Sequence, residues 1–315
     1  MSVIVFGSIN IDLVTTVSRL PLPGETLLGR NFFQAPGGKG ANQAVALARL
    51  GIPTQMVGRV GADSFGEELL KSLQASGVQT ENVFVDETIS SGVAAIAVDD
   101  AGENQIIVVP GANGRVNQDD VERLSRLLPQ ASALLLQLEI PMSAVIAASA
   151  AATEAGVRVI LDPAPAQSHL PDELYQLVDI ITPNEREVSQ LVGFSVSGEE
   201  SAKKAAGQLR QKGVKNAIVK LGAQGVVCAT SSETFFVPAF AVDAVDTVAA
   251  GDAFNGGLAA ALSEGLSLEQ AARWGAAAGA LAATKPGAQP SLPDRLTFDA
   301  FLKERGVMRR LKYER

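Results

Sequence analysis

The sequence predicts an α/β fold of three layers, in which helices cover both faces of a largely parallel β-sheet. Two repeating observations support this prediction. Helical segments end in a glycine followed by Val or Ile, which is typical of helix C-termini, at Gly51, Gly77, Gly156 and Gly213. A short β-branched or apolar run follows most of these glycines, as at 157–161 and 217–221. Such alternation of helices and apolar strands is typical of a parallel sheet that is buried on both sides.

The individual elements are expected in a regular order. Residues 1–7 are expected to form a buried strand, and the apolar run 134–140 another. Strands 157–161, 178–181 and 217–221 follow, and helices begin after the glycines of 36–40 and near Asn184. The last predicted helix starts near Asp252, because apolar residues recur there at helical spacing, and Gly265 is placed to end it.

Two strand-like regions interrupt this alternation, at about 11–34 and about 84–110. The second contains the turn 99–102 between two apolar runs, which indicates a hairpin. Together they predict a small antiparallel flap that projects from the main sheet. Because so few strands cannot bury both of their faces, the flap is expected to pack on a ligand or on a second copy, as a lid and in a homodimer. No linker-like segment divides residues 1–315, so a single domain is expected.

Composition excludes several function classes. The 315 residues are 47% hydrophobic, which suits a large core, and the net charge of −8 argues against nucleic acid or an anionic membrane as partner. Basic residues are scattered, except for a cluster at 309–312. The only cysteine is Cys228, and no secretory or membrane-spanning segment is evident, so a soluble cytoplasmic protein is expected. With His169 as the only histidine, acid–base chemistry is expected from carboxylates.

A turn of small residues leads into the last predicted helix at 246–257. The amides of Ala249, Ala250 and Gly251 are expected to be unpaired at the helix N-terminus, where the helix dipole favours phosphate oxygens. Asp252 would then lie beside a bound phosphate. Taken alone, Asp252 is better explained as an ordinary N-cap residue, and only the small residues that flank it favour the phosphate role.

In three further segments, polar side chains lie next to glycines or to an apolar run. Lys39 and Asn42 follow closely spaced glycines and are expected to reach a polar ligand, although a tight turn with a solvated lysine explains them equally well. Asn10 and Asp12 lie beyond the first strand and suit sugar hydroxyls, although such residues are often only turn formers. Glu139 interrupts a very apolar run and therefore requires a partner.

Two segments suit a nucleotide and its metal. Asn184 and Glu187 have the spacing of a helix capping box, and Glu187 is alternatively placed to hold hydrated Mg²⁺ through water. The turn 220–225, bracketed by glycines, either cradles a nucleotide or is only a hairpin.

In combination, three of these segments resemble the PfkB family of carbohydrate kinases. They are Gly-Gly-Lys-Gly-Ala-Asn at 37–42, Asn184-x-x-Glu187 and Ala-Ala-Gly-Asp at 249–252. Segments 137–141, 162–166 and 287–291 resemble in particular the members that act on ribose. The resemblance extends over roughly residues 3 to 303, in the order typical of the family.

This resemblance implies phosphorylation of D-ribose at O5 by ATP, with Mg²⁺ and an activating K⁺. It assigns sugar binding to Asn10, Asp12, Gly38, Lys39, Asn42 and Glu139. It makes Asp252 the catalytic base and places an anion hole at Ala249, Ala250 and Gly251. It assigns ATP contacts to Asn184, Lys220, Gly222, Gly225 and Gly251, and the Mg²⁺ region to Glu187. It implies that K⁺ is bound by Asp246 and Ser291 and by the backbone oxygens of Val248, Ala282, Lys285 and Gly287.

Two residues depart from the family pattern. Ala276 replaces a frequent Asn or His near the nucleotide, so the adenine is expected to make mainly apolar contacts. Lys220 replaces a frequent Thr, so a charge-assisted phosphate contact is expected.

Alternative functions remain open. They are a PfkB kinase for a ketose, a keto-deoxy sugar acid or a nucleoside, and a sugar-binding relative without catalysis. A Rossmann oxidoreductase is excluded, because Gly7-Ser8-Ile9-Asn10 lacks the G-x-G-x-x-G pattern.

Overall fold

A nine-stranded sheet forms the centre of the molecule, with strand order β13-β12-β11-β10-β9-β8-β1-β4-β5. The computed structural model describes residues 1–307, so the basic cluster at 309–312 lies outside the described residues. The strands, in chain order, are β1 (Ser2–Phe6), β4 (Thr54–Gly61), β5 (Gln79–Asp86), β8 (Ala131–Leu136), β9 (Arg158–Leu161), β10 (Ile180–Ile181), β11 (Asn216–Lys220), β12 (Gly225–Ala229) and β13 (Thr234–Pro238). All neighbouring pairs from β5 to β11 are parallel, whereas β12 and β13 are antiparallel additions at one edge.

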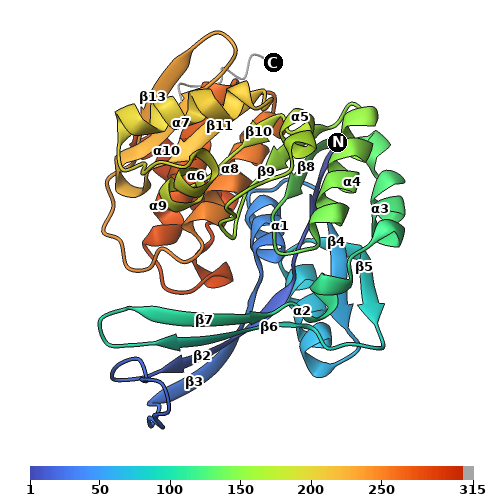
Figure 1. Ribbon diagram of the computed structural model, residues 1–315, viewed down its shortest axis with the longest axis vertical. Helices are drawn as coiled ribbons and strands as arrows, with labels where there is room; N and C mark the ends of the chain where they lie inside the picture. Colours follow the sequence, from blue (N-terminus) through green and yellow to red (C-terminus); the bar gives the residue numbers. More distant parts are fainter. Residues whose placement is uncertain (308–315) are drawn as a thin grey trace.

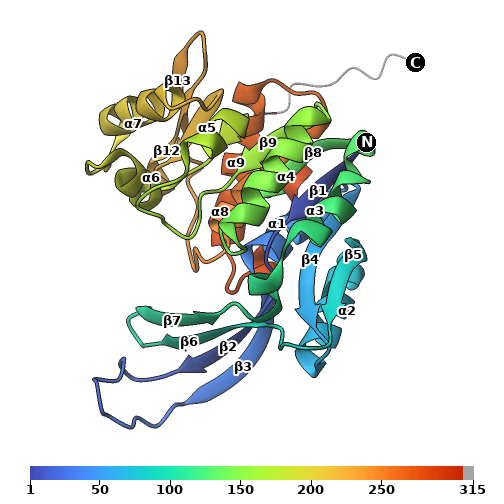
Figure 2. The ribbon, with the colours of Figure 1, turned by 45° about the vertical axis from the view of Figure 1, so that its right-hand side comes forward.

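Helices cover both faces of this sheet, as the fold prediction requires (Figures 1 and 2). Successive strand residues point to opposite faces, so Val3 and Val5 join one apolar core while Ile4 and Phe6 join the other. The first core includes residues of α1 (Lys39–Arg49), α2 (Ser64–Ala75), α8 (Ala250–Ser263), α9 (Leu268–Ala283) and α10 (Arg295–Glu304). The second includes residues of α3 (Gln118–Ser125), α4 (Met142–Glu154), α5 (Asp172–Leu177), α6 (Glu185–Val192) and α7 (Glu199–Gln211). The three-layer α/β/α prediction is confirmed.

Helix ends follow the glycine pattern seen in the sequence. Gly51, Gly77 and Gly156 have positive φ angles of 82°, 86° and 71°, a conformation that glycine adopts without steric cost. The residue after each of these glycines donates a hydrogen bond from its amide to the carbonyl five residues earlier, as in the bond from Ile52 to Leu47. This arrangement ends each helix and turns the chain toward the following segment.

A separate four-stranded sheet, which we call the flap, contains β2 (Asn10–Thr16), β3 (Asn31–Gly37), β6 (Gly92–Val98) and β7 (Asn104–Val109), in the order β3-β2-β6-β7. The hairpin predicted around 99–102 is present between β6 and β7. Two details of the prediction are wrong. β2 pairs with β6 in parallel, so the flap is mixed rather than antiparallel. Residues 84–86 belong to β5 of the main sheet, and 17–30 form a loop, so the strands occupy less of the two segments than expected.

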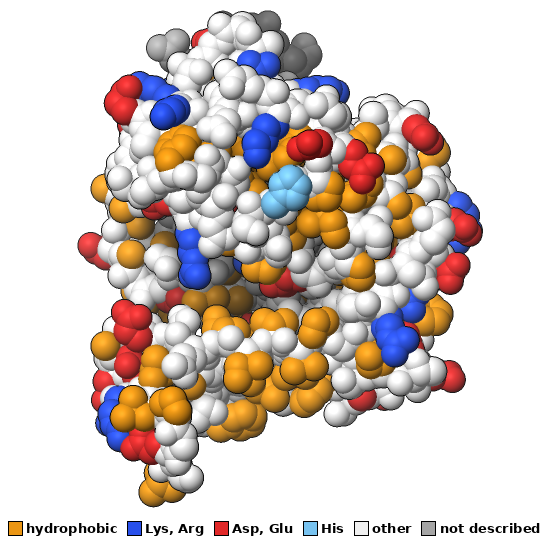
Figure 3. Space-filling model, in the orientation of Figure 1, with side chains coloured by type: hydrophobic (Ala, Val, Ile, Leu, Met, Phe, Trp, Pro, Cys, Tyr) orange, Lys and Arg blue, Asp and Glu red, His pale blue; other side chains and the backbone are white. Residues whose placement is uncertain are grey.

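The flap projects from one end of the main sheet (Figure 2). The space-filling view shows a hollow between the flap and the helical body (Figure 3). Much of its apolar surface is exposed, including Phe32 at 66% and Ile107 at 69%. Within residues 1–307, no helix has the length and apolar character needed to cross a bilayer.

Candidate active site

Asp252 lies in the first turn of α8 and is only 5% exposed. The helix begins at Ala250 with Ala249 as its N-cap, so Asp252 is not the capping residue. Its carboxylate is instead held by α1: Asn42 Nδ2 donates to Oδ2 at 3.0 Å, and Gln43 Nε2 donates to Oδ1 at 3.1 Å. The simple N-cap interpretation is therefore wrong, and the carboxylate is available for a role outside its own helix.

The turn before α8 differs in one respect from the sequence prediction. The Ala250 amide donates to the carbonyl of Thr247 at 3.1 Å, because the turn closes on itself before the helix starts. The expectation of an unpaired amide is therefore wrong for Ala250. The amides of Ala249, Gly251 and Asp252 form no hydrogen bond to any described residue. Three backbone donors thus remain at the N-terminus of α8, with the amide of Asp252 in place of that of Ala250.

Burial dominates the electrostatics of this site. It raises the pKa of Asp252 to about 6, with Lys39 opposing the shift and Asp162 adding to it. Burial alone would lower the pKa of Lys39, but four surrounding carboxylates outweigh it and raise that pKa. These carboxylates belong to Asp252, Asp162, Glu139 and Glu187. Lys39 is therefore a permanent cation in an acidic cluster, and the solvated-lysine interpretation is wrong.

Asn10 and Asp12 are strand residues on β2 rather than turn formers. Asn10 is buried, and its Oδ1 accepts a hydrogen bond of 2.7 Å from Asn113. Asp12 lies against Gly37, where a Cβ atom would come within 2.3 Å of the Asp12 carboxylate. Burial, together with Glu139 and Asp252, raises the pKa of Asp12 to about 7. Both side chains lie where the flap joins the body.

The glycines near α1 allow two backbone segments of the protein to pack closely against each other. Gly38 has a φ of +88°, and a Cβ atom there would lie 2.7 Å from the amide nitrogen of Asn10. Gly40 lies inside α1 rather than before it, and packs against the backbone of Ser8. These glycines bring the start of α1 against the chain segment between β1 and β2, close to the backbone of Asn10.

The partly buried Glu139 has the hydrogen-bond partners that its apolar surroundings require. Ser8 Oγ donates to Glu139 Oε2 at 2.5 Å, and the Lys39 amide donates to the same oxygen at 3.1 Å. The carboxylate therefore fixes the first residue of α1 against the end of β1.

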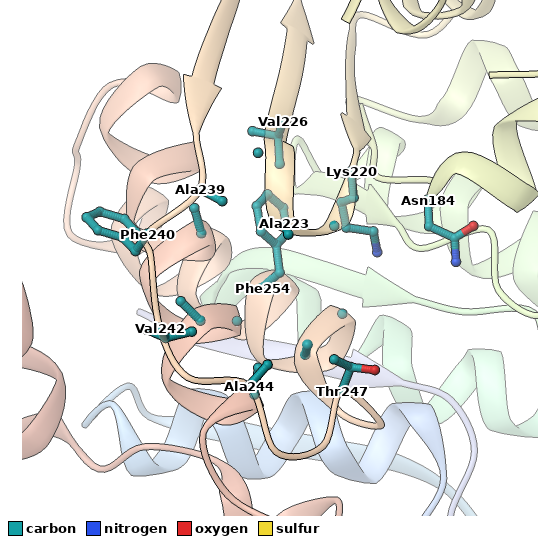
Figure 4. A pocket seen from close by; sticks show the side chains of 18 of the residues that line it. Asn184, Lys220, Ala223, Val226, Ala239, Phe240, Val242, Ala244, Thr247 and Phe254 are labelled. Atoms are coloured by element: carbon teal, nitrogen blue, oxygen red, sulfur yellow. The ribbon is translucent and has the colours of Figure 1, made fainter. Parts of the chain in front are cut away.

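A cavity of about 760 Å³ opens on the other side of the α8 N-terminus (Figure 4). All five residues expected to contact ATP line it, together with Ala276, which departs from the family pattern: Asn184, Lys220, Gly222, Gly225, Gly251 and Ala276. Val226, Phe240, Val242, Phe254 and Ala280 make much of its wall apolar. None of the residues expected to bind sugar is among its lining in the described chain. Asp252 thus stands between a polar cluster and a largely apolar cavity.

The capping box and the hairpin expected in these two segments are confirmed, and residues of both segments also line the cavity. Asn184 and Glu187 form a complete capping box at the start of α6, and Asn184 also lines the cavity. Residues 220–225 connect the antiparallel strands β11 and β12 as a hairpin, and they line the same cavity. Lys220 lies beside Asn184, with which it forms an isolated parallel β-bridge (Figure 4).

Sequence analysis missed two side chains at this site, Gln43 and Asp162. Gln43 Nε2 bonds to Asp252 and also to Asp162 Oδ2, at 3.0 Å. Asp162 Oδ1 accepts from Lys220 Nζ at 3.1 Å. A signal was present: Asp162 directly follows the apolar strand β9, at the carboxyl end of a parallel strand, where such sheets bind ligands.

The residues expected to bind K⁺ lie on two neighbouring segments, which are the loop before α8 and the stretch from the last turn of α9 to Ser291. Asp246 connects them, because its carboxylate accepts from the Val248 amide at 3.0 Å and from the Gly287 amide at 2.8 Å. Ser291 is buried and donates to the Ala288 carbonyl. Carboxylate, hydroxyl and carbonyl oxygens are hard ligands, so this donor set fits an alkali cation.

The resemblance assigns the Mg²⁺ region to one carboxylate, that of Glu187. Both oxygens of Glu187 accept from Asn184, and burial raises the pKa of Glu187. No group of three or more His, Cys, Asp or Glu side chains in residues 1–307 is arranged to hold a metal. Hydrated Mg²⁺ needs few protein carboxylates, so Glu187 has the chemistry to hold such an ion through water.

Comparisons with known proteins agree with this geometry. The profile described as pfkB family carbohydrate kinase matches residues 1–295. The chain belongs to this family. It is 43% identical over 299 residues to a ribokinase of Haemophilus influenzae, which covers 95% of this chain and 97% of that protein. It is 36% identical over 302 residues to a deoxyribokinase of Salmonella typhimurium, covering 96% and 99%.

Solved structures place the same fold around a sugar and a nucleotide. The structure of Arabidopsis thaliana ribokinase complexed with ribose and ATP has a TM-score of 0.88 and 37% identity, and the match covers 96% of this chain and 98% of that one. The α/β/α body and the four-stranded flap of this PfkB kinase therefore follow the architecture of ribokinases.

Proposed function

We propose that this PfkB kinase transfers the γ-phosphoryl group of ATP to O5 of D-ribose, giving D-ribose 5-phosphate and ADP. The observation that carries the proposal is the position of Asp252. Its buried carboxylate lies in the first turn of α8, between the polar cluster at the base of the flap and the cavity of about 760 Å³. A sugar on one side and a nucleotide on the other would meet at this carboxylate.

The chemistry requires positioning and neutralisation of charge more than covalent catalysis. Asp252 accepts the proton of the O5 hydroxyl while that oxygen bonds to the γ-phosphorus. The bond from this phosphorus to the oxygen bridging to the β-phosphate breaks, and ADP leaves. With its pKa raised to about 6, Asp252 is ionised at neutral pH and is more basic than an ordinary carboxylate. The amides of Ala249, Gly251 and Asp252 stabilise charge on the phosphoryl oxygens.

The sugar is held by the polar cluster around Asp252. Asn10 and Asp12 on β2 and Lys39 and Asn42 on α1 supply donors and acceptors suited to adjacent hydroxyls. Glu139 and Gly38 fix the start of α1. The Salmonella relative named deoxyribokinase makes 2-deoxyribose the main competing substrate to test.

The nucleotide occupies the cavity, with adenine against the apolar wall near Ala276. Asn184, Lys220 and the glycines Gly222, Gly225 and Gly251 contact the nucleotide. When bound, Mg²⁺ neutralises charge on the phosphates, and Glu187 would orient its water ligands. K⁺ would be held by Asp246, Ser291 and the backbone oxygens of Val248, Ala282, Lys285 and Gly287, in loops adjoining the turn before α8.

We further infer that the chain acts as one catalytic unit in the cytoplasm, with the flap as its lid. The flap face opposite Asp12 is apolar. It carries Leu13, Phe32 and Ile107, which line a depression of about 580 Å³. A second copy of the flap would cover this face in a homodimer. Light scattering of Ile107→Glu against the unmodified protein tests this, and a monomeric unmodified protein would contradict it.

The activity is tested by coupled ADP release with a panel of sugars. Ribose is expected to have the highest kcat/KM, ahead of 2-deoxyribose, fructose, a keto-deoxy sugar acid and adenosine, with product identity checked as ribose 5-phosphate. A higher value for any of the others would overturn the substrate assignment. ATP binding and sugar binding without ADP release would instead support the non-catalytic alternative.

A further inference from the structure

A continuous series of hydrogen bonds connects the nucleotide cavity to the Asp252 carboxylate. Lys220 Nζ donates to Asp162 Oδ1 at 3.1 Å. Gln43 Nε2 donates to Asp162 Oδ2 at 3.0 Å and to Asp252 Oδ1 at 3.1 Å. Asp162, Gln43 and Asp252 are all at least 95% buried. Water therefore does not substitute readily for any of these bonds.

The orientation of the Gln43 side-chain amide is fixed by a hydrogen bond from Gln137. Gln137 Nε2 donates to Gln43 Oε1 at 2.7 Å, which leaves the two N–H groups of Gln43 for the two carboxylates. Gln137 is itself fully buried and lies over Gly7, where a Cβ atom would collide with its Oε1. The amide of Gln43 therefore cannot flip without losing several bonds at once.

Lys220 is the end of the series that faces the nucleotide. It lines the cavity, and its Nζ would lie 3.5 Å from a Cβ atom on Gly251 in the first turn of α8. Its ammonium group is thus beside the amides that face the phosphate position. Only one ion-pair partner of Lys220 is present in the described residues, and that is Asp162.

We propose that Asp162 is a positioning residue for phosphoryl transfer, holding the Lys220 ammonium group at the phosphate position with one carboxylate oxygen and the Gln43 amide on Asp252 with the other. This inference rests on the proposed function and deepens it. Neither oxygen is redundant, because each accepts from a different donor on a different structural element. The Asp162 side chain thereby connects the ammonium group that would meet the phosphate with the proposed base, Asp252.

Substitution of Asp162 by Asn tests this arrangement with little change of shape. The Asn side chain has one acceptor oxygen, so its NH₂ group must face either the Lys220 ammonium or the Gln43 amide, both of which are donors. One of the two contacts is therefore lost. Because hydrogen bonds to charged groups are the stronger ones, kcat is expected to fall about 10- to 100-fold. The KM for ribose is expected to change by less than about threefold, because Asp162 does not contact the sugar cluster directly.

The pH profile supplies a readout that a purely structural role would not change. The charged groups facing Asp252 are Lys39 on α1, Asp12 on β2 and Asp162 after β9, with Lys220 on β11 behind Asp162. Burial is the main cause that raises the pKa of Asp252, and the negative charge of Asp162 adds to it. Asp162→Asn is therefore expected to move the acid limb of kcat/KM to lower pH.

The chain contains a matched control in Asp179. One of its oxygens also accepts from a lysine, Lys215, at 2.6 Å, and the other accepts from the Val159 amide at 2.7 Å. This pair lies before β10, at the opposite end of the sheet from Asp162. Asp179→Asn removes a similar ion pair and is expected to leave kcat and the acid limb unchanged.

A double-mutant cycle with Lys220→Met completes the test. If Asp162 acts partly through Lys220, the loss of kcat in the double variant is smaller than the product of the two single losses. Unchanged kcat in Asp162→Asn, strictly multiplicative losses, or an unmoved acid limb would each overturn the proposal. If Asp162→Asn fails to fold by circular dichroism, Gln43→Met provides the second variant, with the same expected loss of kcat. Failure of the proposed function is distinguishable, because then the unmodified protein itself would not phosphorylate ribose.

Discussion

Asn42 and Asp252 are 210 residues apart in the sequence and are joined by a hydrogen bond of 3.0 Å from Nδ2 to Oδ2. Asn42 lies on α1 and Asp252 on α8, two helices that pack against each other. The bond places a proposed sugar ligand in direct contact with the proposed base. A sugar that binds Asn42 would therefore also act on the group that holds the Asp252 carboxylate in place.

Asn42→Leu is expected to reduce kcat about tenfold and to move the acid limb of kcat/KM to higher pH. Burial raises the pKa of Asp252, and the Asn42 hydrogen bond counteracts this, so its removal lets the pKa rise further. Asn216→Leu is the control, because Asn216 Nδ2 bonds to the Asp179 carbonyl far from the site. An acid limb that stays in place in Asn42→Leu would contradict the role given to this bond.

Asp12→Asn is expected to stabilise the free protein at pH 8, while raising the KM for ribose. The pKa of Asp12 is raised from 3.8 to about 7 by burial and two neighbouring carboxylates, so folding favours its protonated form. That stabilisation is fully present below about pH 4 and is lost as pH rises through about 7. At pH 8 the buried Asp12 carboxylate is ionised, and this costs on the order of 4 kcal/mol of stability. The Asn side chain carries no charge and avoids that cost. Urea unfolding of both proteins at pH 4 and pH 8 measures this; an equal difference at the two pH values would contradict it.

Ala276→Phe is expected to raise the KM for ATP at least about tenfold, with the KM for ribose unchanged. Ala276 lines the cavity on α9, and a phenyl ring there occupies space assigned to the base of the nucleotide. Arg273→Phe places the same ring on an exposed position of the same helix as a control. If Ala276→Phe altered the KM for ribose and not that for ATP, the two sides of the site would be wrongly assigned.

Withholding K⁺, with Na⁺ or Tris in its place, is expected to lower kcat and leave ribose binding largely intact. The proposed ion lies in loops next to the turn that carries Ala249 and does not touch the sugar cluster. Asp246→Asn should make activity less responsive to added K⁺, because Asp246 connects the two loops through the amides of Val248 and Gly287. Equal rates in all cations would remove the K⁺ assignment.

The parts of the fold that were predictable arise from local sequence signals. Helix ends at Gly51, Gly77 and Gly156 follow from the tolerance of glycine for positive φ, and the buried strands follow from their apolar runs. The parallel pairing of β2 with β6 was not predictable, because nothing within either strand specifies which distant strand lies beside it.

At the candidate site, too, local features were predictable from the sequence and contacts between distant segments were not. Asp252 and the turn before it were found from spacing and small residues, which are local. The bond of the Ala250 amide depends on how that turn closes, and the roles of Gln43 and Asp162 depend on contacts across more than 100 residues of sequence. Such polar contacts between distant segments carry no periodic signal that a single sequence reveals.

Turnover of the Asp252→Asn variant tests the central claim most directly. The variant keeps the shape of the side chain but cannot accept the O5 proton, so kcat is expected to fall by about 10² to 10⁴. Calorimetric titration should show that ribose and ATP still bind, which separates a lost base from a misfolded site. A variant that binds both substrates and turns over at a rate near that of the unmodified protein would show that Asp252 is not the base.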